Sequence, residues 1–156
     1  MKAMLLVPMI LLSATTVRAQ GASSSKLPEG VQWTAVPPAL PPGAEIAVLD
    51  GDPAKAEPYT IRLKFPDRYT VAPHFHPTDE HVTVISGTLR LGMGDSIDQK
   101  GMKTLRSGGY VTAPAQMHHY AVAQGKTVVQ IHGMGPFAIT YVNPNDDPRN
   151  TTASTQ

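Results

Sequence analysis

Two histidines and a glutamate lie close together in a pattern that suits metal binding. The segment Pro73–His81 reads PHFHPTDEH and contains His74, His76 and Glu80. In a β-strand, residues i and i+2 point to the same side, so a strand here presents both imidazoles to one face. A turn at Pro77–Thr78 followed by an antiparallel strand would set the Glu80 carboxylate beside the rings. Two neutral imidazoles and a carboxylate suit a divalent metal that keeps open positions. The alternative is an exposed hairpin with polar side chains.

A second histidine cluster lies further along the chain, in the segment PAQMHHY that ends at Tyr120. It contains His118 and His119. A histidine pair after a turn is more often structural or exposed, so this cluster gains weight only when it is paired with the first one. His81 is one residue out of phase with Glu80. We therefore expect its side chain to point outward or to lie behind the ligands.

Further polar residues are candidates for a pocket around the metal. In the segment TVVQIH, Gln130 and His132 share one side of a strand, and the apolar residues between them share the other. The polar side faces either solvent or the interior of the fold. We consider Gln130, His132, His118 and Tyr120 for pocket or supporting positions. For Tyr120, an aromatic plug is the simpler interpretation.

Short apolar runs separated by turns must position these residues. From Glu45 to Val142 there are about ten such runs, each roughly 4–7 residues long, and they end at Gly, Pro, Asn or Asp. No segment has a convincing helical period. The chain also contains 15 Pro and 13 Gly, which disfavour long helices. The sequence therefore predicts an all-β fold, a small antiparallel β-barrel or sandwich, over residues 44–143.

The two ends of the chain differ from this central part. Residues 1–19 combine Lys2, an apolar run containing Pro8, and a small-residue exit at Ala19, which is typical of a secretory signal peptide. The run is about 12 residues long, too short to anchor the chain in a membrane. We expect export to the periplasm or the medium, with Gln20 as the first mature residue. Residues 20–43 read as a flexible leader and a Pro-rich arm anchored by Trp33, and residues 144–156 as a disordered tail.

The overall composition excludes several functional classes. Thirteen Lys and Arg balance 12 Asp and Glu, so there is no basic footprint for nucleic acid. The chain has no cysteine, which excludes disulfides, thiol nucleophiles and iron–sulfur clusters. The arm is too poor in apolar residues to form a core of its own. We expect it to pack on the barrel or on a partner copy, and we predict a homodimer.

With these residues in place, the chain resembles the cupin superfamily. The first cupin motif, G-x5-H-x-H-x(3,4)-E-x6-G, is matched by His74, His76, Glu80 and Gly87. The second, G-x5-P-x-G-x2-H-x3-N, is matched by Gly108, Pro114 and His119. The chain departs from the motifs at three turn or packing positions, where the family has Gly, Gly and Asn and this sequence has Arg68, Gln116 and Ala123.

The resemblance implies a jelly-roll barrel with a metal at its mouth. The implied ligands are His74, His76, Glu80 and His119, of which the fourth rests mainly on the family pattern. A turn shifted at Gln116 would exchange the roles of His118 and His119. One divalent ion is expected, and three His with one Glu accept Fe, Mn, Ni, Cu or Zn.

Open coordination positions suggest an enzyme that acts on a small molecule. We favour dioxygenase-type chemistry on a small oxygen-bearing organic compound, with isomerase or lyase chemistry as the other enzymatic options. The alternative is a non-catalytic protein that binds a metal or a small ligand.

Overall fold

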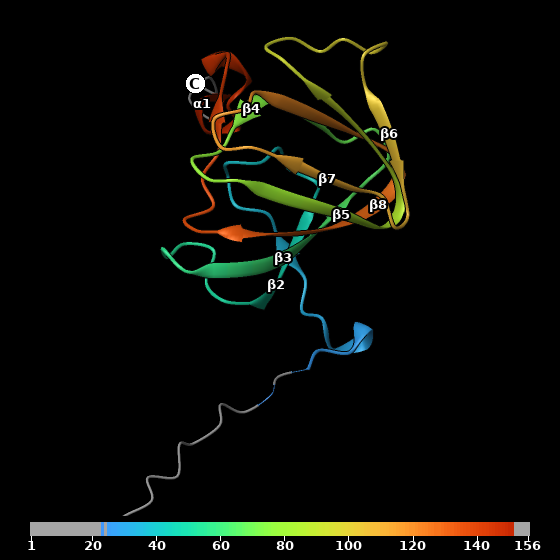
Figure 1. Ribbon diagram of the computed structural model, residues 1–156, viewed down its shortest axis with the longest axis vertical. Helices are drawn as coiled ribbons and strands as arrows, with labels where there is room; N and C mark the ends of the chain where they lie inside the picture. Colours follow the sequence, from blue (N-terminus) through green and yellow to red (C-terminus); the bar gives the residue numbers. More distant parts are fainter. Residues whose placement is uncertain (1–22, 24, 152–156) are drawn as a thin grey trace, which may run out of the picture.

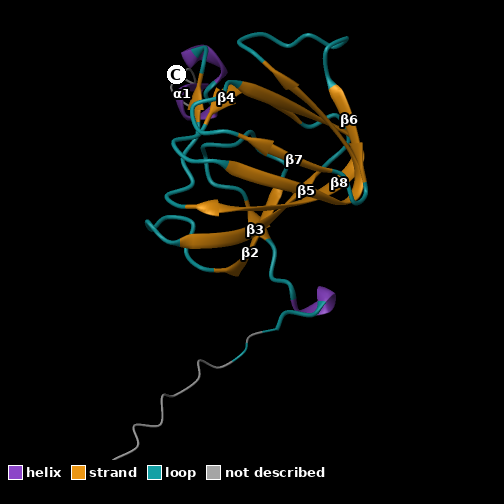
Figure 2. Cartoon of the chain, viewed as in Figure 1, coloured by secondary structure: helices purple, strands orange, loops and turns teal. Residues whose placement is uncertain are grey.

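The computed structural model describes residues 23 and 25–151 of the chain (Figure 1). The predicted signal peptide, residues 1–19, lies outside the described residues, as does the predicted start of the mature chain at Gln20. The described part is dominated by strands, and its helices are single short turns near the two ends (Figure 2). It contains no helix with the length and hydrophobicity that crossing a bilayer requires.

Nine antiparallel strands form the barrel, as the sequence predicts for an all-β fold. In chain order the strands are β1 (Thr34–Ala35), β2 (Glu45–Asp50), β3 (Pro58–Phe65), β4 (Thr70–Phe75), β5 (Glu80–Met93), β6 (Lys103–Arg106), β7 (Tyr110–Ala113), β8 (His119–Met134) and β9 (Thr140–Tyr141). Two of these differ from the sequence expectation. β5 and β8 are each continuous, whereas the pattern predicts two strands on either side of Gly87 and of Gly125.

The long strands β5 and β8 pair with each other from end to end. Glu80 pairs with Gly133 at one end of this ladder, and Met93 pairs with His119 at the other. The first half of β5 also pairs with β7, and the second half pairs with β6. β8 pairs with β4 through its first half and with β3 through its second. The β5–β8 ribbon thus contributes half of its length to each of two facing sheets, which is a jelly-roll arrangement.

A sharp corner separates the two halves of this ribbon. The register shifts between Val84 and Thr88, and Gly87 adopts a left-handed φ of 82°. A Cβ at Gly87 would lie 2.3 Å from the carbonyl oxygen of Lys126, so only glycine fits there. Thr127 is fully buried at the corner, and its hydroxyl donates to the Thr88 carbonyl at 2.9 Å. Glycine therefore bends the strands here without ending them.

Alternation along the strands fills the barrel with apolar side chains. β3 alternates exposed and buried positions along its length, and its buried members join residues of β5 and β8 in a single core. That core includes Tyr59, Ile61, Leu63, Phe65, Val82, Val84, Leu89, Leu91, Val129 and Ile131.

The Pro-rich arm packs on its own barrel. β1 pairs with β2, and the arm then inserts Leu40, which is 5% exposed, into the core. Two tyrosine hydroxyls hold the arm by donating to its backbone, Tyr141 to Ala39 at 2.9 Å and Tyr69 to Pro41. Trp33, the expected anchor, is only partly buried under the Lys64 ammonium, so Leu40 has that role instead. The homodimer stays a prediction.

The first part of the predicted disordered tail contains short helical turns, and residues 152–156 lie outside the described residues. Residues 144–151 form a short 3₁₀ turn, η2 (Pro144–Asp146), and one helical turn, α1 (Pro148–Thr151). The Asn143 side chain accepts from the Asn145 amide at 3.1 Å, and Arg149 donates to the Ile139 carbonyl at 3.1 Å. Polar caps and a side chain tied to the backbone order this segment, although it has no apolar face.

The corner generates a prediction about stability. Gly87→Ala should lower the free energy of unfolding at least twice as much as Gly125→Ala. Both residues have positive φ, 82° and 75°, and that strain alone costs about 1–2 kcal/mol for alanine. A Cβ at Gly125 meets nothing within 4 Å, whereas one at Gly87 collides with backbone. Urea denaturation of the two variants measures the difference, and equal losses would contradict the role of this corner.

Candidate metal centre

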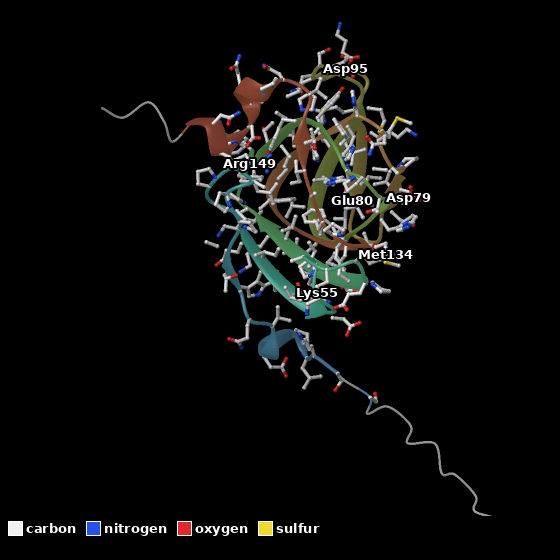
Figure 3. All side chains as sticks on the ribbon, turned by 90° about the vertical axis from the view of Figure 1, so that its left-hand side faces the viewer. Lys55, Asp79, Glu80, Asp95, Met134 and Arg149 are labelled. Carbon is white, nitrogen blue, oxygen red and sulfur yellow. The ribbon has the colours of Figure 1, made fainter. Side chains whose placement is uncertain are left out.

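Three histidines and one glutamate converge inside the barrel. His74 lies near the end of β4, His76 directly after it, and Glu80 and His119 open β5 and β8. All four side chains are buried. One nitrogen from each histidine lies within 4.8 Å of the other two. Glu80 Oε1 is 3.6 Å from His76 Nε2, and Oε2 is 3.4 Å from His119 Nε2. Figure 3 shows Glu80 in the body of the barrel and its neighbour Asp79 at the rim.

An irregularity in β4 turns two histidines inward. The β4–β8 register shifts between Val71 and His74. Such a bulge changes which residues of a strand face inward. Val71 lines the interior cavity, and so do His74 and His76, although they are out of phase with Val71. The alternation of inward and outward residues therefore holds for His74 and His76, but it does not extend across the bulge to Val71.

The backbone holds each histidine in one tautomer. Nδ1 of His74, His76 and His119 lies 2.7, 2.7 and 2.9 Å from the carbonyl oxygens of Ala72, Ala138 and Met117 respectively. A carbonyl only accepts, so each Nδ1 must carry a proton and donate it. In the neutral rings, Nε2 then presents its lone pair to the centre of the cluster. Metal-binding histidines are commonly oriented in this way.

Two of these Nε2 atoms, in His76 and His119, are buried without a hydrogen-bond partner among the described residues. Both face the Glu80 carboxylate, so lone pairs would meet lone pairs unless a cation lies between them. Unpaired buried polar atoms are rare and costly in folded proteins. A divalent cation satisfies all of these atoms at once, and the residues present therefore fit a metal ion.

The pKa shifts of the cluster residues also favour metal binding. Burial lowers the pKa of His74 to about 3, with the neighbouring histidines adding to the effect, and burial also lowers the pKa of His76. Burial alone would lower the pKa of His119 too, but the adjacent Glu80 carboxylate outweighs it and raises that pKa. Burial alone would raise the pKa of Glu80, yet its contacts with His119 and His76 lower it. The carboxylate is thus ionised, and any proton in the metal-free cluster resides on His119.

Two residues keep the family's turns despite their side chains. Arg68 and Gln116 stand where the cupin motifs have glycine. They are the non-glycine residues of the described chain with positive φ, at 60° and 63°. The Gln116 amide donates to the His76 carbonyl at 2.9 Å, which ties this turn to the ligand segment. The turn is therefore not shifted, and His119 faces the cluster, whereas His118 does not.

A small apolar cavity adjoins the cluster. Its volume is about 40 Å³, room for roughly three waters at about 10–15 Å³ each. His74, His76, Glu80 and His119 are its polar lining, and the other walls are apolar, among them Leu40, Val71, Leu91, Ile131, Phe137 and Ile139. The Phe137 ring stacks on His76 with centroids 5.1 Å apart.

The other sequence candidates lie outside this cavity. His118 is half-buried, pairs with Asp95 at 2.6 Å and stacks on Phe75. Gln130 and His132 face outward, because Val129 and Ile131 take the inward positions of β8. Their expected pocket roles are corrected accordingly.

Tyr120 is buried but also points away from the cavity. It lies against Gly92, where a Cβ would come within 2.3 Å of the ring, and its hydroxyl accepts from the Asp98 amide at 2.9 Å. His81 points outward, as the parity of Glu80 predicts, and its Nδ1 lies 2.7 Å from the Tyr110 hydroxyl.

Sequence reasoning missed two cavity residues, Leu40 and Phe137. Leu40 belongs to an arm with no strand period, and Phe137 lies in a segment that reads as a strand, although only Thr140–Tyr141 pairs there. The pattern of Pro and single apolar residues carried no signal for either position.

Comparisons with known proteins identify the family. The family model described as "Domain of unknown function (DUF4437)" matches residues 27–151. The chain belongs to this family. A search of curated proteins finds no match.

Solved structures show that the fold is that of the cupin superfamily. The polyketide cyclase RemF from Streptomyces resistomycificus is similar with a TM-score of 0.67 and 15% identity, over 84% of this chain and 93% of RemF. A putative acetylacetone dioxygenase from Methylibium petroleiphilum gives 0.63 and 18%, over 85% and 90%. An RmlC-like cupin from Shewanella frigidimarina gives 0.55 and 15%, over 70% and 87%. At these identities the likeness shows the fold and not the activity.

The ligand set generates a prediction with a built-in control. His74→Ala and His119→Ala should each lose most of the tightly bound metal, because each removes a lone pair from the cluster. His118→Ala should retain it, since His118 neighbours His119 in sequence but pairs with Asp95. Metal analysis after exhaustive dialysis measures the retained ion. If His118→Ala empties the site and His119→Ala does not, the fourth ligand is misassigned.

The pKa shifts predict how metal affinity depends on pH. His119 holds a proton up to a raised pKa, and the ion must displace that proton, whereas the lowered pKa values of His74 and His76 leave those rings neutral. The Zn²⁺ affinity should therefore rise about tenfold per pH unit below the pKa of His119, and acid should release the ion. Calorimetry at a pH below the pKa of His119, in two buffers of different ionisation enthalpy, counts the protons released, and one is expected. At that pH, release of three protons or of none would contradict the assignment.

Proposed function

We propose that this chain is an exported mononuclear metal enzyme that performs dioxygenase-type chemistry on a small oxygen-bearing organic compound. The observation that supports it best is the set of three Nε2 lone pairs, each oriented by a backbone carbonyl, that meet an ionised Glu80 beside an apolar cavity. Four donors leave one or two coordination positions of a divalent ion for other molecules.

In this proposal the protein's own residues hold the metal ion and keep water away from it. A divalent ion such as Fe²⁺ would supply Lewis acidity and redox chemistry. The three histidines and Glu80 hold it, and the anionic carboxylate lowers the net charge of the site. Leu40, Phe137 and the other apolar walls exclude water, which strengthens electrostatic interactions inside the cavity.

The cavity lining favours oxygen chemistry over isomerase or lyase chemistry. Among the described residues that line it, every ionisable group belongs to the proposed ligand set. Isomerisation and elimination need a positioned acid or base to move a proton, and here each candidate would have to leave the metal first. A dioxygenation places both atoms of O₂ in the product and needs no external reductant or separate proton donor.

The structural neighbours support the same choice at the level of the fold. They include a putative acetylacetone dioxygenase and an oxalate oxidase, both named for reactions of small oxygen-bearing molecules. The neighbours also include the polyketide cyclase RemF and KdgF from Halomonas sp., so they do not share one named activity.

The cavity size favours a substrate of few atoms and also supports the alternative function. At about 40 Å³, the cavity takes a ligand of a few heavy atoms. A larger substrate requires Leu40 or Phe137 to move. A non-catalytic metal-binding protein would not require Leu40 or Phe137 to move, because it need not admit a substrate. The small volume of the cavity therefore supports this second candidate function as well.

The export part of the proposal rests on residues 1–19. Their basic start, apolar run and small-residue exit are those of a secretory signal peptide, and they support a periplasmic or secreted bacterial protein.

Oxygen uptake tests the proposed function. The Fe²⁺-loaded protein is mixed with a graded set of small 1,2- and 1,3-dicarbonyl compounds and followed with an oxygen electrode. We expect consumption of one O₂ per molecule converted, and its loss in His119→Ala. Normal metal content with no uptake across the set would favour the non-catalytic alternative.

Truncating the arm's cavity residue extends this test to substrate size. Leu40→Ala should shift activity toward the longer members of the set, because it enlarges the cavity. Leu27→Ala is the matched control, since Leu27 is 63% exposed in the leader that precedes the arm. Equal changes in both variants would indicate that Leu40 does not limit substrate size.

A further inference from the structure

A second pair of imidazoles lies on the outside of the barrel. His81 on β5 and His132 on β8 are direct cross-strand partners. Their rings stack with centroids 4.8 Å apart and planes 12° apart. Both side chains are on the outer face, because the inward positions of these strands belong to Glu80, Val82 and Ile131. The pair is therefore separate from the internal cluster, although Glu80 and His81 are neighbours in sequence.

A polar row across the sheet contains this pair. His81 also pairs with Thr112 of β7, and His132 pairs with Thr60 of β3. Thr60 in turn pairs with Asp50 at the end of β2. No apolar side chain interrupts the row, so the two imidazoles do not belong to a hydrophobic cluster.

Hydrogen bonds orient the His81 ring. Its Nδ1 lies 2.7 Å from the Tyr110 hydroxyl, which lies 3.0 Å from the Thr112 hydroxyl. A chain in which Nδ1 donates to Tyr110 and Tyr110 donates to Thr112 satisfies all three groups. In that tautomer the lone pair of His81 is on Nε2; the Tyr110 hydroxyl, unlike a backbone carbonyl, also accommodates the other tautomer. Neither ring nitrogen of His132 has a hydrogen bond to the described residues.

Both rings line an open groove of about 670 Å³. Asp50 and Asp79 also line it, and so add negative charge that favours a cation. The Asp79 carboxylate already accepts from the Ala115 amide at 2.7 Å, which holds it at the rim.

We propose that His81 and His132 form a second metal site on the barrel surface, which binds a divalent transition ion such as Zn²⁺. The two nitrogens converge on one ion when the exposed His132 ring turns from its stacked position toward Nε2 of His81. Water completes the coordination, because within the described chain only the internal cluster brings three histidine or acidic donors together. This site is weaker than the internal one and exchanges with solvent. It does not depend on the proposed function.

The half-buried His118 provides the contrast that the test needs. It is also a surface histidine, but its Nδ1 is engaged by Asp95 at 2.6 Å and its ring stacks on Phe75. Its partner across that contact is a single carboxylate and not a second imidazole.

Zn²⁺ titration of the metal-free full chain by calorimetry tests the proposal. The wild type should bind two ions per chain, one tight and one weaker. His132→Gln and His81→Gln should each lose the weaker ion and keep the tight one. His119→Ala should lose the tight ion and keep the weaker one, and His118→Gln should keep both. Ring ¹⁵N chemical shifts of His81 and His132 should move together with the second equivalent.

Each remaining outcome overturns the surface site. Binding of a single ion by the wild type would show that there is no second site. Binding of two ions by His132→Gln, or loss of the second ion in His118→Gln, would show that the second ion binds elsewhere. Circular dichroism of each variant verifies folding, and His132 is exposed enough for its replacement to leave the barrel intact. An enzyme assay that fails while two ions bind would count against the proposed function alone.

Discussion

The candidate site exists because the β5–β8 ribbon is folded back on itself. Glu80 and His119 begin these two strands and lie at opposite ends of their common ladder. A straight strand of 14 residues would separate those ends by about 45 Å. Here the carboxylate oxygen and the imidazole nitrogen are 3.4 Å apart. The left-handed Gly87 and the buried Thr127 hydroxyl form the corner of this ribbon. They therefore decide whether Glu80 and His119 meet, although they are not part of the site.

The folded ribbon places four polar groups where the rest of the interior is apolar, and this conflict defines the chemistry. Neutral rings with Nδ1 donating to carbonyls must present lone pairs to an anionic Glu80. Without a cation the cluster contains unpaired buried nitrogens, and a single proton on His119 satisfies only one contact. A metal ion in this position would contribute to the free energy of folding as well as to reactivity, because the unfolded chain cannot assemble donors from three strands.

Local patterns in the sequence predicted most of the fold and the side chains of the internal cluster. Alternation predicted the antiparallel barrel, the i, i+2 rule placed His74 and His76 on one side of a strand, and parity placed His81 opposite to Glu80. What failed was non-local. Gly87 and Gly125 read as strand ends because a pattern cannot distinguish a corner from a terminus. Gln130 and His132 were ambiguous because parity identifies two faces without saying which is inside. Leu40 came from an arm whose position depends on the tyrosine hydroxyls of distant strands.

The way the internal histidines are oriented bears on how this family can diverge. The acceptors for the three Nδ1 protons are main-chain carbonyls, of Ala72, Met117 and Ala138, and every residue type carries a carbonyl. A substitution at any of these three positions changes a side chain but cannot delete the acceptor. The geometry of the centre is thereby encoded in the path of the backbone. Substitutions at neighbouring positions can therefore change the lining of the cavity without changing how the three imidazoles are oriented.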